Sequence, residues 1–217
     1  MLDKMKTTEK NVFDNTDGFS FIFGLVASDS YEHVLLINPR SGEDLEFLIK
    51  RNPIIDSFVS DEQWVEPAKS FSINVFAGYS HKPLLQVPDA AYDLILVCED
   101  IGYVDDCDAM LREYHRLLKP GGTLAGGVYN LRYADNIDRL LGGNVKNCYD
   151  NLCGNAVIPI DCLIVRLGEL GFSHAEIHNL QGERKDIGKY ADISALYSKP
   201  ASSHMFSTKI HFIRACK

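Results

Sequence analysis

The sequence lacks the features typical of exported, membrane-spanning and zinc-binding proteins. No apolar run approaches the roughly 18 residues that a membrane-spanning helix needs, and residues 1–10 are polar rather than a basic start followed by an apolar stretch. No two of the six cysteines are separated by two residues, so the chain has no CxxC motif of a zinc or redox site. We therefore expect a soluble, cytoplasmic protein whose thiols are reduced.

Basic residues are also scarce relative to acidic ones. Lys and Arg number 22 against 30 Asp and Glu, which gives a formal net charge of -8 at pH 7. The phosphates of nucleic acids and anionic lipids repel such a chain. We expect no nucleic acid and no membrane as partners, and a small molecule as the substrate. The sequence does not indicate the oligomeric state.

Three motifs of common enzyme classes are missing. The chain contains no Gly-x-Ser-x-Gly nucleophile elbow, no phosphate-binding Gly-Lys-Ser/Thr loop and no Gly-x-Gly-x-x-Gly fingerprint. Serine hydrolases, P-loop phosphatases and nicotinamide-dependent enzymes are therefore disfavoured.

What the sequence does contain is an alternation of apolar, β-rich runs with helical patterns. Strands are predicted at residues 33–38, 54–60, 72–76, 92–98, 123–129, 173–180 and 208–215. Because helical patterns separate the strands through the first two thirds, a mostly parallel, doubly wound sheet is favoured. We expect an α/β, Rossmann-like fold with seven strands, the last of which is antiparallel.

The helices between these strands carry recognisable start and stop signals. Asp105 or Asp106 is predicted to cap a helix that ends before Pro120, and Asp161 is predicted to cap a last helix that ends at Gly171. Weaker helical patterns cover residues 43–51, 63–69 and 133–141. Residues 1–30 are interpreted as an N-terminal cap segment, and residues 31–217 as a single domain with a variable insertion at 130–160.

Two neighbouring stretches carry a family resemblance. They are PDAAYDLILVCEDIGYVDD at residues 88–106 and LREYHRLLKPGGTL at residues 111–124. Both are similar to phrases around the fourth and fifth strands of the class I S-adenosylmethionine-dependent methyltransferases, particularly the small-molecule type 11 group. The resemblance implies S-adenosyl-L-methionine as the cofactor, and a small metabolite or sugar whose oxygen or nitrogen accepts the methyl group.

The resemblance implies that the cofactor lies over the loops that follow the first and fourth strands. In the first loop, Asn38, Arg40 and Gly42 are the expected contacts, and only Gly42 remains of the several glycines usual there. Pro39 also contributes no amide donor. The other expected contacts are an acid at the end of the second strand, an aromatic residue after the third and the end of the fourth: Asp61 or Glu62, with Asp61 preferred, then Tyr79, Cys98 and Glu99.

Methyl transfer requires a positioned acceptor and, for a protonated acceptor, a nearby base. Many small-molecule members of the family have a histidine after the fourth strand, and Tyr103 takes that position here. Tyr103, Glu99 and His81 are therefore the candidate catalytic residues.

Two alternatives remain open at this stage. His174, Glu176 and His178 share one face of a predicted strand, which is compatible with metal binding, but a solvated sheet face is favoured and no metal is expected. The loss of glycines and the presence of Pro39 suggest a second function, a methyltransferase-like domain that has lost activity and serves as a binding or scaffold domain.

Overall fold

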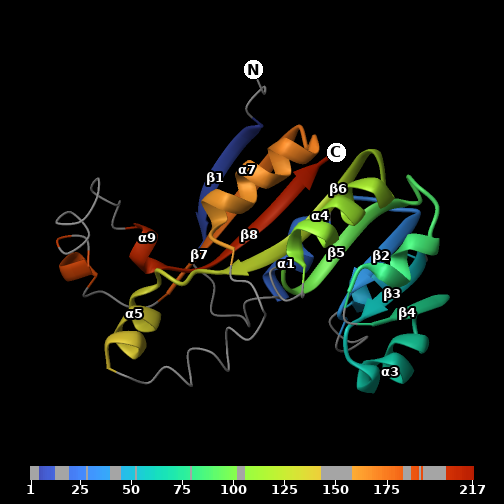
Figure 1. Ribbon diagram of the computed structural model, residues 1–217, viewed down its shortest axis with the longest axis horizontal. Helices are drawn as coiled ribbons and strands as arrows, with labels where there is room; N and C mark the ends of the chain where they lie inside the picture. The colour runs from blue at the N-terminus through green and yellow to red at the C-terminus, as the bar shows by residue number, and fades with distance from the viewer. Residues whose placement is uncertain are drawn as a thin grey trace.

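The structure is a computed structural model in which the protein forms one eight-stranded sheet flanked by helices (Figure 1). It describes residues 5–12, 20–27, 29–39, 45–51, 53–78, 80–101, 106–142, 158–182, 187–190, 192 and 204–217. The strand order is β1-β7-β8-β6-β5-β2-β3-β4.

One half of the sheet is parallel and is built from elements that follow one another closely. Strands β2, β3, β4, β5 and β6 are all parallel to their sheet neighbours within this half. Each segment that connects one of these strands to the next contains a helix. The elements are β2 (His33–Ile37), α2 (Glu46–Ile49), β3 (Ile54–Val59), η1 (Glu62–Trp64), α3 (Val65–Lys69), β4 (Asn74–Ala77), η2 (Lys82–Gln86), β5 (Tyr92–Asp100), α4 (Cys107–Leu117) and β6 (Leu118–Tyr129).

The other half combines segments from both ends of the chain. Strand β8 is antiparallel to both β6 and β7, while β1 is parallel to β7 and forms the edge. The elements are β1 (Lys6–Val12), α1 (Ser20–Val26), α5 (Ala134–Leu141), α7 (Ile160–Leu170), β7 (His174–Gln181), α9 (His204–Ser207) and β8 (Thr208–Cys216). The predicted α/β class and the antiparallel last strand are confirmed.

The predicted number of seven strands is wrong, because β1 adds an eighth. Its sequence, KTTEKNV, is polar at most positions and has no apolar alternation. An edge strand gains its stability from the backbone ladder with its neighbour, here Lys6 beside His174 through Val12 beside Leu180. Such a strand needs few apolar side chains, so hydrophobic patterning does not reveal it.

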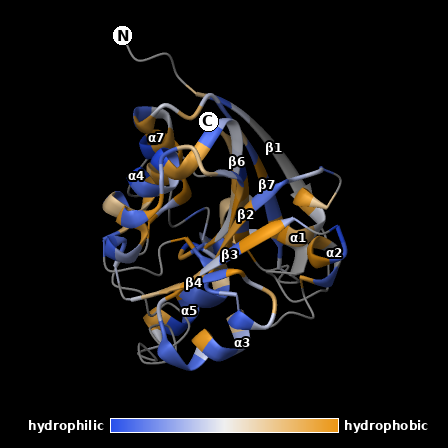
Figure 2. Cartoon of the chain, turned by 90° about the vertical axis from the view of Figure 1, so that its right-hand side faces the viewer, coloured by the Kyte–Doolittle hydropathy of each residue, from blue (hydrophilic) through white to orange (hydrophobic). Residues whose placement is uncertain are grey.

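Helices cover both faces of the sheet. Figure 2 shows α4 and α7 on one side and α1 and α2 on the other. Residues of α4 and α7, such as Leu111 and Leu163, pack with Ile95 in one core, whereas Ile22 of α1 and Leu48 of α2 belong to the core on the opposite face. Burial on both faces explains the continuous apolar sequence of the central strands.

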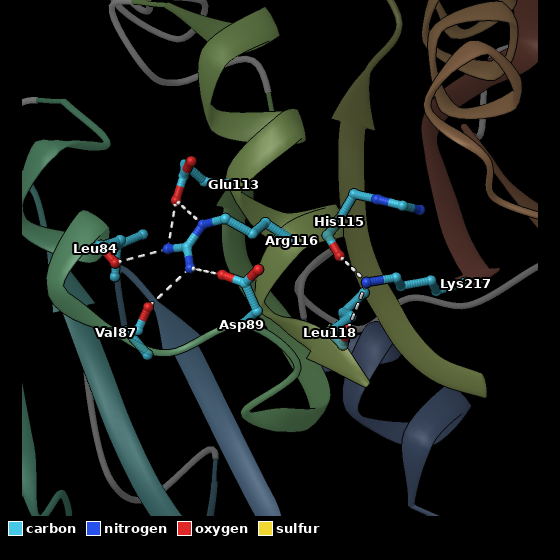
Figure 3. Close-up of polar contacts among 8 residues, drawn as sticks. All are labelled: Leu84, Val87, Asp89, Glu113, His115, Arg116, Leu118 and Lys217. Carbon is cyan, nitrogen blue, oxygen red and sulfur yellow. Dashed lines mark hydrogen bonds and ion pairs between the residues drawn. The ribbon is translucent and has the colours of Figure 1, made fainter. Parts of the chain in front are cut away.

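Helix α4 is anchored at both ends. Asp106 caps its start, as predicted, by accepting a hydrogen bond from the Ala109 amide at 2.9 Å. Near its end, Arg116 pairs with Glu113 and Asp89 and donates to the Leu84 and Val87 carbonyls (Figure 3). These contacts fix the helix to the segment that leads into β5.

The final residue of the sequence stabilises the same helix. The Lys217 ammonium donates to the carbonyls of His115 and Leu118 at 2.6 and 2.8 Å (Figure 3). Carbonyls at a helix C-terminus lack partners within the helix and favour a nearby cation. The neighbouring Lys119 makes no such contact with the helix in the described structure and pairs with Asp93 at 2.9 Å.

The predicted cap of α7 is wrong. The helix starts at Ile160 with Pro159 in the capping position, so Asp161 lies within the first turn. Proline is favoured at helix starts because its fixed φ suits the helix and its missing amide is not needed there. The Asp161 carboxylate pairs with Arg132 at 3.2 Å instead.

Candidate functional site

The carboxyl ends of four parallel strands meet at one edge of the sheet. Ile37 at the end of β2 lies beside Phe58 of β3 and Val97 of β5, and Val59 of β3 lies beside Ala77 of β4. The chain runs outward from β2 through β3 to β4 and then returns to β5 on the other side of β2. Open α/β sheets bind ligands at such a reversal of strand order.

Asn38 connects the ends of β2 and β3. It has a positive φ of 51° and is 6% exposed. Its side-chain oxygen accepts a hydrogen bond from the Ser60 amide at 2.7 Å, while its own amide donates to the Phe58 carbonyl at 2.7 Å. The carboxamide of Asn38 therefore shapes the edge, and Pro39 directly after it is buried.

Asp61 follows β3 and is partly exposed, whereas its neighbour Glu62 is exposed within η1. The Asp61 carboxylate accepts from the Gln63 amide at 3.0 Å and from the Gln63 side chain at 2.5 Å. These two bonds orient the carboxylate and occupy one position on each oxygen. A carboxylate oxygen accepts more than one hydrogen bond, so Asp61 retains capacity for the hydroxyls of a ligand.

His81 lies beyond β4, at the start of η2. Its Nδ1 atom is buried and makes no hydrogen bond to any residue that the structure describes. Strand β4 is three positions from β5 in the sheet, a separation of roughly 14 Å at about 4.8 Å per strand. The fold therefore does not bring the strand before His81 next to the strand that carries Glu99.

The end of β5 is fixed to the end of β6. The Asp100 carboxylate accepts a hydrogen bond from the Tyr129 amide at 2.6 Å. Cys98 and Glu99 precede it on β5 and are half-buried. The Cys98 thiol is 3.7 Å from the Leu96 carbonyl, a weak contact within its own strand.

The structure thus brings Asn38, Asp61, Cys98 and Glu99 to one edge. Four other predicted site residues, Arg40, Gly42, Tyr79 and Tyr103, lie outside the described residues.

A cavity of about 640 Å³ opens at the same edge, beside β6, β8 and β7. Tyr129 and Asn130 line it from the end of β6, and Ile160 and Ile164 from α7. His211 of β8 also lines it. The volume lies within the range that accommodates small organic ligands.

Asn130 forms hydrogen bonds to three other residues that line this cavity. Its side-chain nitrogen donates to the carbonyls of Met205 and Thr208, both at 2.7 Å, and its side-chain oxygen accepts from the Arg132 amide at 3.0 Å. Asn130 is 6% exposed. One buried carboxamide therefore ties the chain after β6 to α9 and to the start of β8.

His211 is a buried and oriented imidazole. It is 8% exposed, and its Nδ1 lies 2.7 Å from the side-chain oxygen of Asn179. Burial lowers the pKa of His211 to about 4, with Asp161 opposing the shift and Arg132 adding to it. At neutral pH the ring is uncharged, and with Nδ1 donating to Asn179, Nε2 is a hydrogen-bond acceptor.

No group of His, Cys, Asp or Glu suited to a metal ion occurs among the residues that the structure describes. The predicted solvated face at His174–His178 is wrong for His178, which is 8% exposed, because it shares its face of β7 with the buried core residue Leu180. Its Nε2 lies 3.7 Å from the Glu176 carboxylate. No helix in the described part of the chain has the length and apolarity to cross a membrane.

Known proteins with a similar sequence or fold include methyltransferases. Residues 61–126 match the family described as "Methyltransferase domain". A SAM-dependent methyltransferase of Thermotoga maritima, named as a possible histamine N-methyltransferase, is 19% identical and has a TM-score of 0.61, covering 92% of this chain and 86% of its own. This chain has a class I methyltransferase fold.

Other methyltransferase structures agree. A SAM-dependent methyltransferase of Archaeoglobus fulgidus has a TM-score of 0.61 at 15% identity, covering 86% of each chain. One from Mesorhizobium loti has a TM-score of 0.57 at 13% identity, covering 91% of this chain and 96% of its own. No curated protein matches by sequence. The three neighbours are named as methyltransferases that depend on S-adenosylmethionine, and with the matched domain they indicate this cofactor.

Three residues of this cavity, Asn130, Asn179 and His211, are not evident from the sequence. Each is a polar residue that is buried at the edge of the sheet, at 6%, 9% and 8% exposure. The available signal was His211 within an apolar strand sequence, since a polar side chain in such a run is buried at a cost unless it has a partner. The partner, Asn179, comes from a different strand and could not be inferred from spacing.

Proposed function

We propose that the protein is an S-adenosylmethionine-dependent methyltransferase that acts on a small molecule. The observation that carries the proposal is the meeting of Asn38, Asp61 and Glu99 at the reversal point of a methyltransferase-type sheet. A small acceptor is supported by the 640 Å³ cavity beside that point. The name of the Thermotoga relative refers to a small amine, in line with this acceptor class.

The described residues fit the nucleoside part of the cofactor. Asp61 would hold the ribose hydroxyls, because its carboxylate is already oriented by Gln63 and retains acceptor capacity. The Nδ1 of His81, which is buried and has no hydrogen-bond partner among the described residues, lies beyond β4, and it would hydrogen-bond the base there. When bound, S-adenosylmethionine supplies an activated methyl group on a sulfonium sulfur.

Glu99 and Tyr103 are the proposed groups at the reacting end. Glu99 lies at the end of β5, which is held against β6 by the bond from the Tyr129 amide to Asp100. Its carboxylate would accept a proton from the acceptor. We retain Tyr103 in this role from the family pattern alone.

Calorimetric titration with S-adenosylhomocysteine, the product form of the cofactor, tests the proposal. A ligand that binds only the native state stabilises it by about 2.7 kcal/mol at one hundred times its dissociation constant. We therefore expect a measurable binding heat and a raised melting temperature. No heat and no shift at millimolar ligand would overturn the enzymatic function.

A binding or scaffold domain without catalytic activity is the second candidate. The observation that favours it is Pro39, which is buried directly after β2 and supplies no amide for the carboxylate of the cofactor. The same titration separates the two functions, because a scaffold domain that has lost its cofactor site gives no binding heat.

A further inference from the structure

We propose that the cavity beside β6, β8 and β7 is the methyl-acceptor site, and that His211 selects acceptors that carry a hydrogen-bond-donating hydroxyl or N–H group. The role as acceptor site rests on the proposed function, whereas the ligand selectivity of the cavity does not. The ligand class is an uncharged small molecule with an apolar body and one donor group.

The position of the cavity supports this role. Its wall residue Tyr129 donates its amide to Asp100 at 2.6 Å, and Asp100 directly follows Glu99 on β5. The cavity therefore begins one strand away from the proposed reacting end. It does not include Asp61, so cofactor and acceptor would occupy separate sites on the same edge.

The lining of the cavity sets the ligand chemistry. Among the lining residues that the structure describes, Arg132 and Asp161 are the only Arg, Lys, Asp or Glu side chains, and they pair with each other at 3.2 Å. Ile160, Ile164 and Ile177 give it an apolar wall. A charged ligand would find no unpaired countercharge among these described residues, so an uncharged ligand is favoured.

His211 supplies the selectivity because its orientation is fixed. Asn179 holds Nδ1 at 2.7 Å, and the chain around the cavity is held by Asn130 through bonds of 2.7 Å to Met205 and Thr208. The uncharged ring then presents an acceptor nitrogen, which gains a partner from a hydroxyl or N–H donor but not from an ether. A preorganised group of this kind costs little to order when the ligand binds.

Phenol and anisole are suitable probes, because they share an aromatic ring and differ in the donor hydroxyl. We would titrate each into the full-length ¹⁵N-labelled protein, in the presence and absence of saturating S-adenosylhomocysteine, and follow the backbone amides and the His211 ring nitrogens by NMR. One neutral hydrogen bond corresponds to about threefold to tenfold in affinity. We expect phenol to bind more tightly than anisole by this factor, to shift the His211 ring nitrogens and the amides around Asn130, and to remain bound with S-adenosylhomocysteine present.

Variants locate the effect at His211. His211→Phe should bind phenol and anisole equally while its affinity for S-adenosylhomocysteine is unchanged. His174→Phe is the matched control, because His174 lies on β7 at a position that alternates with Ala175 and Ile177 and so faces the other side of the sheet. It should retain the preference for phenol. Ile164→Trp, which fills the cavity from α7, should weaken both probes more than tenfold and serves also where His211→Phe does not fold.

Distinct results overturn the two proposals. Equal binding of phenol and anisole by the wild-type protein, a preference that persists in His211→Phe, or displacement of phenol by S-adenosylhomocysteine would overturn the acceptor site alone. A preference for phenol without any binding of S-adenosylhomocysteine would remove the methyltransferase function and the acceptor role, and would leave a selective small-molecule site.

Discussion

One buried asparagine directly follows β2 and another follows β6, where the parallel half of the sheet meets the other half, and the two residues act over different distances. Asn38 follows β2 and bonds Ser60, which directly follows the next strand, β3, whereas Asn130 follows β6 and bonds Met205 and Thr208, more than seventy residues later. The first edge is thus built locally. The second is assembled from remote segments and encloses the cavity.

This difference suggests a division of labour. The local half carries the residues proposed to hold a cofactor that all class I methyltransferases share, and its connections are short. The remote half encloses the proposed acceptor site with segments that can change without disturbing the other half. The following predictions test whether the two halves are separable in stability and in binding.

The largest effect is expected from Asn130→Leu. The substitution removes three hydrogen bonds, one buried and two part-buried, and leaves the Met205 and Thr208 carbonyls and the Arg132 amide without this partner. Each unsatisfied buried group costs about 1–3 kcal/mol, so we expect the free energy of unfolding to fall by about 4 kcal/mol. Urea denaturation measures this change. Binding of S-adenosylhomocysteine to the fraction that remains folded should persist, and its loss would show that the halves are coupled.

The next effect is a dependence of stability on pH that arises from His211. Its folded pKa of about 4 lies below the ordinary value of 6.5, so between these pH values the unfolded chain binds a proton that the native protein does not. The contribution of the neutral ring is therefore complete above pH 6.5 and is lost as the pH falls towards 4, by up to about 3 kcal/mol.

Urea denaturation of wild type and His211→Gln at pH 7.5 and pH 4.5 isolates the contribution of His211 to the free energy of unfolding, because the other titrating groups are common to both proteins. The stability of the wild type should fall more steeply with acid than that of the variant. Parallel losses in the two proteins would mean that His211 is protonated in the native state.

A smaller effect is expected for Asp61→Ala in the other half. Loss of a charged acceptor for ribose hydroxyls corresponds to about 1.5–3 kcal/mol, or a tenfold to hundredfold weaker affinity for S-adenosylhomocysteine. Calorimetry measures it. Glu62→Gln is the matched control, since Glu62 is the adjacent exposed acid, and it should bind as the wild type does. If Glu62→Gln weakens binding more than Asp61→Ala, the ribose contact belongs to Glu62.

The smallest effect is expected for Asn38→Gly. Glycine accepts the φ of 51° without strain but loses the bond to the Ser60 amide, which costs about 1 kcal/mol. Asn38→Ala should cost about 1 kcal/mol more, because alanine is strained at positive φ. Urea midpoints of the two variants measure the difference. Equal stability of both variants would show that the backbone at residue 38 relaxes.

The sequence predicted the local half of the molecule better than the remote half. The predicted strand 92–98 contains the continuous aliphatic run 94–97, and the helix start at Asp106 has a capping side chain three residues before its donor. These patterns reflect short-range physics. The edge strand β1 has no such pattern, because it is held by the backbone ladder with a strand 168 residues away and needs few apolar side chains.

The candidate site divides in the same way. Asp61 could be predicted because an acid at the end of the second strand occupies a fixed place in the fold. The contact between His211 and Asn179 depends on the pairing of β7 with β8, which only the folded sheet reveals. Asp161 was misassigned for the same reason, since its partner Arg132 is remote in the sequence.

The pairing of β1 with β7 also affects the order in which parts of the protein fold. Lys6 lies beside His174, and Thr7 on the same strand lines the cavity. Contacts between such distant parts of a chain form slowly, because the entropy of closing the intervening loop is lost before any contact compensates for it. During synthesis the first strand must wait until β7, 168 residues later, has emerged, so the small-molecule cavity would form late in folding.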